Sequence, residues 1–352
     1  KFIVDEGDPL NELLFNKSID NIRSLGIFKS VKSDIQEGSS QNLKVVNLTV
    51  EEKPTGEISL GAGVGTDGST VGFSVSENNY MGKGIKLRSS LRLSTDTIRG
   101  QFTVVNPNYK YTDKSLFTNV QSIQTDKLAT NGYKSTKTGF SVGTNFEQYD
   151  SIYLSPKISS YYESLTTNSG ASSNLRKQEG SNIDTNFSYA IDYDKRNQRF
   201  MTTEGFRSTF DQSLPLLSDT YSIINGYQFD IYKKLDNDMI TNFSVFTRAI
   251  NSLSDKDVRV SNRLSLPSKK LRGFEYSKIG PVDSGDYIGG NYAAAINVST
   301  TLPMFLQNME TADVSYFIDI GNVWGVDYSS SIDDSNKIRS SSGILLNWFT
   351  PI

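Results

Sequence analysis

Leu271-Arg272-Gly273-Phe274 is the stretch of this sequence whose residue types could form a specific internal contact. Arginine offers five donors in a fixed geometry for a buried carboxylate, and glycine permits a tight turn beside it. The stretch lies in a connection of about 40 residues, between strand-like runs that end near Ile250 and begin near Gly290, whereas ordinary connections have about 4–6 residues. Such a loop is either disordered or functional. The Arg-Gly-Phe sequence favours function over a solvated loop with an incidental arginine.

An acidic residue whose orientation the sequence predicts lies on an alternating run further along the chain. Between Ala312 and Gly321 the apolar residues fall on one face, so Asp319 points to the opposite, polar face. Other acidic groups are weaker candidates. Asp192 with Asp194, and Asp283 with Asp286, do not fit a known Ca²⁺ loop, and we interpret them as solvated charges.

Composition excludes several classes of protein. The 352 residues contain no histidine and no cysteine, which removes the commonest general base, thiol catalysis, disulfides and Cys-ligated metals. No paired catalytic carboxylates or Ser-His-Asp set can be assembled, so we expect neither an enzyme, nor a metal site, nor a cofactor. Lys and Arg number 36 against 39 acidic residues, and this balance predicts no nucleic-acid partner.

The dominant pattern after Pro54-Thr55-Gly56 is an alternation with a period of two. Hydrophobic residues make up only 36% of the chain, mean hydropathy is −0.40, and no apolar run approaches the ~18 residues of a membrane-spanning helix. Alternating runs of about 9–12 residues recur roughly a dozen times, which suits tilted strands that cross a bilayer. Short connections such as Tyr149-Asp150 alternate with long polar ones such as Leu165 to Ser181. The tyrosines Tyr80, Tyr109, Tyr111, Tyr161 and Tyr162 would form an interfacial girdle.

This pattern predicts a mainly β chain that forms a transmembrane antiparallel β-barrel. In Gly84 to Ser94, for example, leucines and isoleucine oppose Lys86, Arg88 and Arg92. A soluble β-sandwich or an extracellular β-solenoid would need an apolar core face, whereas this inward face is basic and polar. A barrel with a wet interior accounts for it.

Residues 1–53 follow a different pattern. Leucines and isoleucines recur at helical spacing from Leu10 to Leu25, before the stop signal Gly26, and two strand-like runs follow, Ile27 to Ile35 and Leu43 to Val50. We interpret this stretch as the second half of a small α+β module. Lys1 opens in mid-pattern, so a processed or trimmed start is expected.

Several motifs resemble those of one family, the BamA-type barrel-assembly proteins of the Gram-negative outer membrane. Each motif alone is weak, but together they stand in the family's order along the whole chain. They are Leu25-Gly26-Ile27-Phe28 with Val31, Val50-Glu51-Glu52-Lys53, Gly61-Ala62-Gly63-Val64-Gly65, Glu77-Asn78-Asn79-Tyr80-Met81-Gly82-Lys83-Gly84, Arg272-Gly273-Phe274, Gly289-Gly290-Asn291, and Phe317 through Trp324.

The resemblance implies a periplasmic POTRA domain followed by a 16-stranded barrel that folds and inserts other β-barrel proteins into the bacterial outer membrane. Residues 1–54 would be the C-terminal part of the last POTRA domain, in the periplasm, and residues 55–352 the barrel. Expected partners are unfolded outer-membrane β-barrel proteins, accessory outer-membrane lipoproteins, periplasmic chaperones and the lipid bilayer. The last two strands of the family plan are expected to be absent, because Phe349 to Ile352 follow the run that resembles the fourteenth strand.

The resemblance also implies roles for particular residues. The loop that carries Arg272, Gly273 and Phe274 would fold into the lumen, where Arg272 would pair with Asp319. The family usually has a second carboxylate on the preceding strand, and the position that matches it here is Ser299. Insertion needs a weak seam, for which the run Ile58 to Thr66 is the candidate.

In that run Gly61, Gly63 and Gly65 would weaken the strand, although they could equally make room for a neighbouring backbone. The GxGxG spelling also occurs in dinucleotide loops, but no helix follows it here. Alternatives to an insertase are a related POTRA-barrel transporter, of the two-partner secretion or TamA-like kind, and a passive porin.

Overall fold

The structure is a computed structural model. It describes residues 6–40, 43–65, 68–112, 114–199, 201–235, 238–276, 278–303, 312–328, 332 and 337–348. Thr66, at the end of the predicted seam run, and residues 349–352 lie outside this description. Of the helices described, none is both long and apolar enough to cross a membrane.

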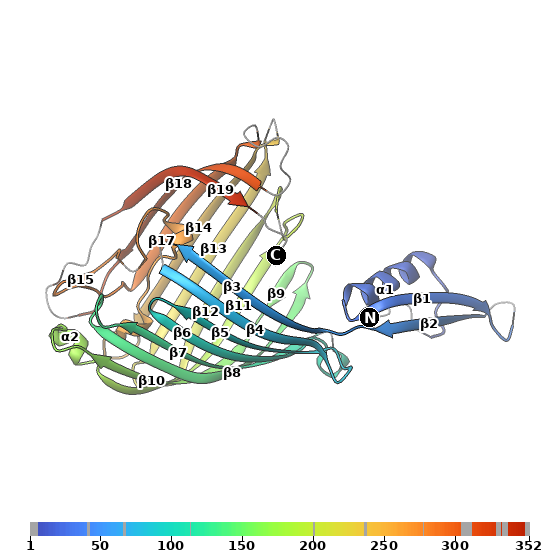
Figure 1. Cartoon of the computed structure of the whole chain (residues 1–352), viewed down its shortest axis with the longest axis horizontal. Helices are drawn as coiled ribbons and strands as arrows, with labels where there is room; N and C mark the ends of the chain where they lie inside the picture. The colour runs from blue at the N-terminus through green and yellow to red at the C-terminus, as the bar shows by residue number, and fades with distance from the viewer. Residues whose placement is uncertain are drawn as a thin grey trace.

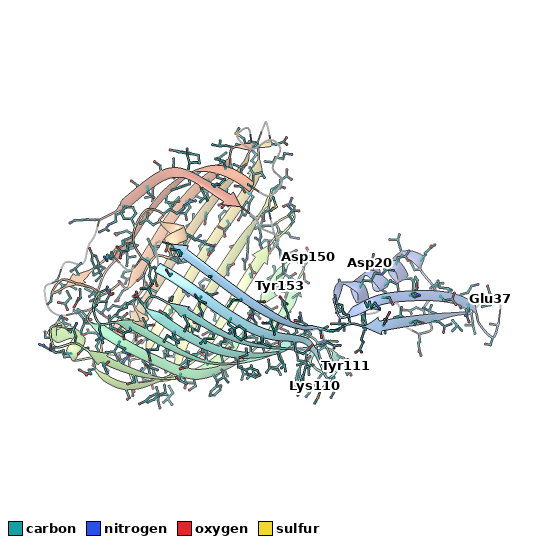
Figure 2. The ribbon with its side chains drawn as sticks, viewed as in Figure 1. Asp20, Glu37, Lys110, Tyr111, Asp150 and Tyr153 are labelled. Carbon is teal, nitrogen blue, oxygen red and sulfur yellow. The ribbon has the colours of Figure 1, made fainter. Side chains whose placement is uncertain are left out.

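The N-terminal unit consists of a helix and a hairpin. Helix α1 (Glu12–Ser24) starts at Asn11, whose side chain accepts hydrogen bonds from two backbone amides of the first turn. Strands β1 (Phe28–Glu37) and β2 (Lys44–Glu52) pair antiparallel, as the sequence predicted. The unit projects from one end of the larger sheet, and Asp20 and Glu37 lie on it (Figures 1 and 2).

The buried stripe of α1 differs from the predicted one. Phe15, Ile19 and Ile22 are buried, whereas Leu13 is 81% exposed and Leu10, Leu14 and Leu25 are also exposed. A two-stranded sheet has room for only a narrow contact with a helix, and Phe15 begins the stripe that faces it. The leucines at the ends of the predicted stripe therefore stay in solvent.

The rest of the chain forms one 15-stranded antiparallel sheet that curves into the wall of a barrel (Figure 1). Apart from β9, each strand of this sheet pairs with the strands of the sheet that precede and follow it in the sequence, and no pairing joins the two edge strands among the described residues. The strands are β3 (Gly56–Gly65), β4 (Gly68–Tyr80), β5 (Ile85–Ser94), β6 (Thr97–Asn106), β7 (Ser115–Lys127), β8 (Tyr133–Tyr149), β9 (Ile152–Leu154), β10 (Lys157–Thr167), β11 (Gly180–Asp194), β12 (Gly205–Ser218), β13 (Ser222–Lys234), β14 (Ile240–Ser252), β17 (Tyr292–Thr301), β18 (Ala312–Trp324) and β19 (Arg339–Trp348).

Strands β9 and β10 occupy a single position in the wall. Both lie between β8 and β11, and only Ser155 and Pro156 separate them. Proline has no amide hydrogen to donate to a neighbouring strand, which explains the interruption. The Pro156 carbonyl still accepts a hydrogen bond from the amide of Thr144 at 3.0 Å, so the wall stays continuous.

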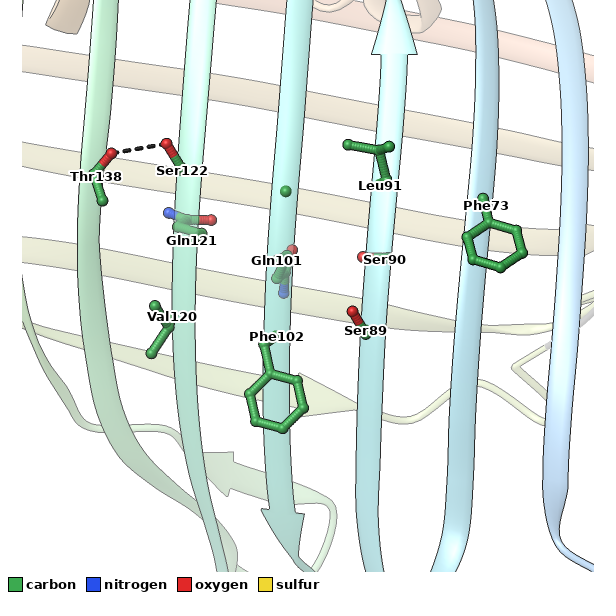
Figure 3. A pocket seen from close by; sticks show the side chains of 11 residues that line it. Phe73, Ser89, Ser90, Leu91, Gln101, Phe102, Val120, Gln121, Ser122 and Thr138 are labelled. Atoms are coloured by element: carbon green, nitrogen blue, oxygen red, sulfur yellow. Dashed lines mark hydrogen bonds between the residues drawn. The ribbon is translucent and has the colours of Figure 1, made fainter.

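Alternate side chains point to opposite faces of this wall, as the period of two predicts. Figure 3 looks through the near wall toward the far one: Phe102 and Val120 lie in front of their strands, and Gln101 and Gln121 lie behind them. The outer face is thus apolar, with a shallow depression of about 430 Å³ where β4 to β8 carry small residues among phenylalanine and leucine. The inner face is polar.

The connections at the two ends of the barrel differ in length. Lys110, Tyr111 and Asp150 lie at the barrel end nearest the N-terminal unit (Figure 2). At the opposite end the chain between β10 and β11 forms a short helix, α2 (Ser173–Arg176).

One prediction for an aromatic residue was wrong. Tyr161, predicted at an interfacial girdle, instead lies within β10, and its hydroxyl accepts a hydrogen bond from Gln121.

Candidate functional site

The long connection between β14 and β17, residues 253–291, packs against the inner face of the barrel, and we call it the lumen loop. It contains the 3₁₀ turns η3 (Val260–Asn262) and η4 (Ser268–Lys270) and the two-residue strands β15 (Val282–Asp283) and β16 (Asp286–Tyr287). A bridge between Leu264 and Gly290 joins two parts of the loop, the second of them directly before β17. The loop therefore folds back on itself where it returns to the wall.

Arg272 contacts Asp319 on β18 in a bidentate ion pair. The Arg272 guanidinium donates to both carboxylate oxygens at 2.7 Å, and the Arg272 backbone amide donates to Asp319 Oδ2 at 3.0 Å. The Asp319 side chain is completely buried, and the apolar residues on either side of it face outward, as their alternation predicted. The guanidinium carbon also lies 3.8 Å from the centre of the Phe317 ring.

The residue opposite Asp319 on β17 is Asn297 rather than Ser299. The strand register pairs Asn297 with Asp319 and Ser299 with Phe317. The Asn297 amide nitrogen donates to Asp319 Oδ1 and to the carbonyl of Lys270, both at 2.8 Å. An amide thus lies beside Asp319 and links it to the loop backbone, and the ion pair has one carboxylate.

Gly273 and Phe274 complete this contact. Gly273 has φ +84°, a left-handed conformation that residues with a side chain rarely adopt. It lets the chain turn directly after Arg272, and it brings Phe274 onto an apolar cluster that contains Leu271, Leu264 and Val323. The arginine is therefore fixed by its carboxylate and by the apolar residues on both sides of it.

A second arginine of the loop forms another buried ion pair. Arg259 Nε lies 3.1 Å from Glu163 Oε2 on β10, and the two side chains are 8% and 1% exposed. One oxygen of Glu163 and one terminal nitrogen of Arg259 have no partner among the described atoms. The pair attaches the loop to a wall strand on the side opposite β18.

The third arginine of the loop pairs with the segment that follows β18. Arg263 Nη2 lies 2.6 Å from Asp327 Oδ1, and its Nη1 donates to Asn291 at 2.8 Å. Its guanidinium also stacks on Tyr328 at 4.5 Å, and the other oxygen of Asp327 accepts the amide of Val258. All three arginines of the lumen loop thus bind carboxylates on different parts of the barrel.

Apolar side chains of the loop bury against the wall in two clusters. One joins Leu264, Leu266 and Leu271 to residues of β14, β17 and β18. The other joins Val260 and Ile288 to Tyr133 and to Leu175 of α2. Together with the three ion pairs, these clusters make the loop part of the barrel core.

The three glycines of the candidate seam lie on the inner face of β3. Register pairs Gly61 with Gly72 and Leu60 with Phe73, and Phe73 points outward in Figure 3. A Cβ atom added at Gly61 or Gly63 would meet no atom within 4 Å. Of the two sequence interpretations, the structure gives no support to a close neighbour that needs these glycines. Beyond β4, no described strand pairs with β3.

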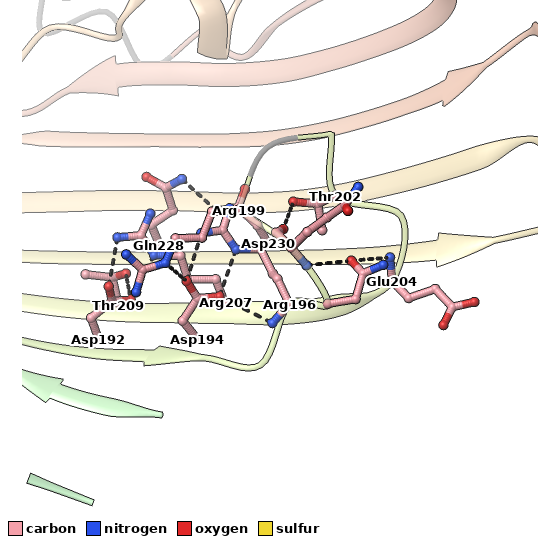
Figure 4. Close-up of polar contacts among 12 residues, drawn as sticks. Asp192, Asp194, Arg196, Arg199, Thr202, Glu204, Arg207, Thr209, Gln228 and Asp230 are labelled. Carbon is pink, nitrogen blue, oxygen red and sulfur yellow. Dashed lines mark hydrogen bonds and ion pairs between the residues drawn. The ribbon is translucent and has the colours of Figure 1, made fainter. Parts of the chain in front are cut away.

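Asp192 and Asp194, considered above as solvated charges, also form ion pairs on the inner face. Arg207 donates to both oxygens of Asp192 at 2.8 and 2.9 Å, and Arg196 donates to both oxygens of Asp194 at 2.8 Å (Figure 4). These carboxylates are neutralised by arginine. Within the described residues, no group of three potential metal ligands occurs.

Sequence reasoning identified one of the three loop arginines and missed Arg259 and Arg263. The available signal was their apolar neighbours, because a solvated loop has little reason to carry such residues: Val258 and Val260 flank Arg259, and Leu264 follows Arg263. Their partners Glu163 and Asp327 could not be matched without the three-dimensional arrangement.

Comparison with known proteins identifies the family to which this barrel and loop belong. A family model described as the Omp85 superfamily domain matches residues 79–352. The chain belongs to the Omp85 superfamily. The resemblance to BamA-type proteins and the mainly β barrel fold are therefore confirmed. The related proteins are named as assembly factors and machinery components, and this Omp85 chain is not an enzyme.

Individual relatives agree with this assignment. The outer membrane protein assembly factor BamA of Neorickettsia risticii (strain Illinois) is 24% identical over 100% of this chain and 48% of its own length. The human sorting and assembly machinery component 50 homolog is 26% identical over 45% of this chain and 35% of its own. The chain thus spans about half the length, or less, of these curated relatives.

A solved structure matches the fold throughout. BamA from Haemophilus ducreyi lacking POTRA domains 1–3 superposes with a TM-score of 0.87 at 20% identity, over 100% of this chain and 75% of that one. At this identity the likeness establishes the long antiparallel barrel sheet and the unit before it.

Proposed function

We propose that this protein folds and inserts β-barrel proteins into the outer membrane of a bacterium, as the core barrel of an assembly machine. Residues 1–54 are the C-terminal part of its last POTRA domain and lie in the periplasm, and residues 55–352 form the barrel. Its partners are unfolded outer-membrane β-barrel proteins, accessory outer-membrane lipoproteins, periplasmic chaperones and the bilayer. The relatives named as assembly components support this function.

The observation that carries the proposal is the contrast between a fixed loop and an edge strand that no described strand covers. Arg272 fixes the lumen loop to Asp319, while β3 presents one edge without a described partner and an inner face of glycines. A client strand can add to such an edge by backbone pairing. Insertion breaks no covalent bond, so it requires no catalytic group.

The roles follow from this geometry. Gly61, Gly63 and Gly65 weaken the seam strand, because glycine carries the highest entropic cost of ordering and packs no side chain. Arg272, Gly273, Phe274 and Asp319 lock the loop in the lumen. The locked loop keeps the opposite wall rigid while the seam accepts a client.

Reconstitution into liposomes tests the proposal. The full-length protein, its Arg272→Ala variant and protein-free liposomes are each given an unfolded barrel client, and the folding rate of the client is followed on gels. We expect acceleration by the native protein and its loss in the variant. Absence of acceleration together with a steady ion conductance would instead favour a pore or a secretion transporter.

A further inference from the structure

Three arginines lie together on the inner face beside the seam. Arg88 and Arg92 are inward-facing residues of β5, and register places Arg92 directly opposite Arg99 of β6. Arg88 and Arg92 are four residues apart, about 13 Å along the strand. We call these three residues the basic stripe.

The basic stripe has no carboxylate partner within the part of the chain that the structure describes. Arg88 donates to the hydroxyl of Ser74 at 3.4 Å, and none of the three arginines forms an ion pair. All three are exposed to a groove of about 490 Å³. The described residues that line this groove include neither Asp nor Glu: Ser59, Leu60, Gly61, Gly72, Phe73, Ser74, Arg88, Ser90, Leu91, Arg92, Arg99, Gln101 and Thr103.

This arrangement opposes stability. Like charges directly opposite each other on neighbouring strands are destabilising. Elsewhere on the inner wall, the arginines of the lumen loop and those of β12 and β14 have carboxylate partners. Because the basic stripe lacks such a partner, binding an anion from outside the chain would relieve its charge repulsion.

The groove indicates what kind of anion would fit. Gly61 and Gly72 form part of its wall, so it lies just inside the edge of β3 that no described strand covers. A strand that added to β3 would point every second side chain into the same lumen. Arginine binds planar carboxylates in a bidentate geometry. A lipid headgroup fits less well, because the basic stripe faces the lumen.

We propose that the basic stripe attracts inward-facing Asp and Glu side chains of a client strand as that strand adds to β3, with Arg88 and Arg92 of β5, about 14 Å from such a strand, as the nearest groups. This inference rests on the proposed insertase function and adds a preference among clients. Clients with carboxylates on the inner face of the entering strand would be favoured over neutral ones, and the preference would weaken with salt, because these groups are solvent-exposed.

The test compares two matched clients on the reconstituted full-length protein. One unfolded barrel carries Asp at two inward-facing positions of its edge strand, and the other carries Asn there. We expect the Asp client to fold about tenfold faster, a difference equivalent to one charge-assisted hydrogen bond. The triple variant Arg88→Gln, Arg92→Gln, Arg99→Gln should remove that difference while it keeps the heat-modifiability of the barrel.

A control variant removes the same number of positive charges from the N-terminal unit, with Lys17→Gln, Lys32→Gln and Lys53→Gln. It should keep the preference for the Asp client. Equal rates for both clients on the native protein, or a preference that survives in the triple arginine variant, would overturn the proposal. Failure of the native protein to accelerate either client would refute the insertase function itself.

A binding experiment tests the role of the basic stripe separately from insertion. A fluorescent strand peptide with alternating Asp should bind the native protein in detergent about tenfold more tightly than its Asn counterpart. Equal affinities would contradict the role of the basic stripe whatever the insertion assay shows.

Discussion

The two halves of the inner barrel wall balance their charges in different ways. On the half that follows the seam, Arg88, Arg92 and Arg99 have no carboxylate partner among the described residues. On the far half, Asp192, Asp211 and Asp319 each contact an arginine, two of them within the wall and one on the lumen loop. Paired charges, among them the fully buried Asp319, fix one half, and exposed arginines without a described carboxylate partner leave the other half available for a partner.

The space around the glycines also differs between the two halves. At Gly61 and Gly63 an added Cβ would meet nothing within 4 Å. At Gly290, near the end of the lumen loop, it would lie 2.6 Å from the carbonyl oxygen of Trp324, and at Gly321 of β18 it would lie 2.9 Å from Leu266. Glycine therefore permits close packing on the loop side, whereas on the seam side it leaves open space.

Removing the Arg272–Asp319 pair should have the largest effect on this contrast. Arg272→Ala leaves the fully buried Asp319 without its cation, at a cost of about 3–5 kcal/mol. The barrel should unfold at a lower temperature in heat-modifiability gels, and client folding should slow to the rate of protein-free liposomes. Arg339→Ala, on a partly exposed arginine of β19 whose guanidinium donates to the carbonyl of Lys337, is the control and should change neither. Unaltered gels and rates in Arg272→Ala would show that the loop needs no lock.

The Arg259–Glu163 pair should contribute less, since it has a single close contact of 3.1 Å. Glu163→Gln leaves Arg259 buried without its anion and should cost about 1–3 kcal/mol. The double variant Arg259→Met, Glu163→Leu replaces both charges by apolar groups and should recover most of that loss. Denaturation of the single and double variants measures both values. A double variant as unstable as the single one would argue that the ion pair itself is required.

The contrast between glycines can be tested by adding one methyl group on each side. Gly290→Ala should destabilise the barrel by about 1–3 kcal/mol, because backbone atoms of Trp324 leave no room for it. Gly61→Ala should be neutral or stabilise it by about 0.5–1 kcal/mol, since alanine loses less entropy than glycine in a strand. Thermal unfolding in detergent compares them. A similar loss of stability in both variants would show that the glycines of the two halves do not differ in the space around them.

A smaller effect is expected at Asp257 of the lumen loop. Burial, and next the nearby charge of Asp327, raise the pKa of Asp257 above its usual value. A carboxyl with a raised pKa in the folded state adds stability below that pKa and loses it as pH rises through it. Asp257→Asn mimics the neutral form, so at pH 7 it should unfold about 1 °C higher, and this gap should close toward pH 4. A gap independent of pH would exclude titration of Asp257 as the cause.

The sequence predicted the wall of this molecule better than its interior contacts. Alternation alone placed Asp319 on the inner face, since its neighbours Ile318 and Ile320 had to face lipid. Turn chemistry and family motifs located the Arg272 loop. The register between strands could not be predicted from the sequence. Alternation determines which face a residue occupies, but not which residue of the neighbouring strand lies opposite it. For this reason Ser299 was matched where Asn297 lies.

Long-range partners were beyond the sequence for a related reason. Arg259 and Glu163 are 96 residues apart, and Arg263 and Asp327 are 64 apart. Nothing local in either segment specifies its partner, because the contact forms only when the wall curves around the loop. The N-terminal helix shows the same limit: its periodicity was visible, but which stripe would be buried depended on the hairpin that covers it.

Amide hydrogen exchange of the full-length protein in bilayers tests the central claim most directly, which is that one half of the barrel is fixed by the lumen loop and the seam half is not. Exchange reports local opening, which is fast where contacts are few. We predict that peptides from β3 and β4 exchange far faster than those from β14, β17 and β18, and that Arg272→Ala brings the second group toward the first. Equal protection of both groups in the native protein would contradict the account.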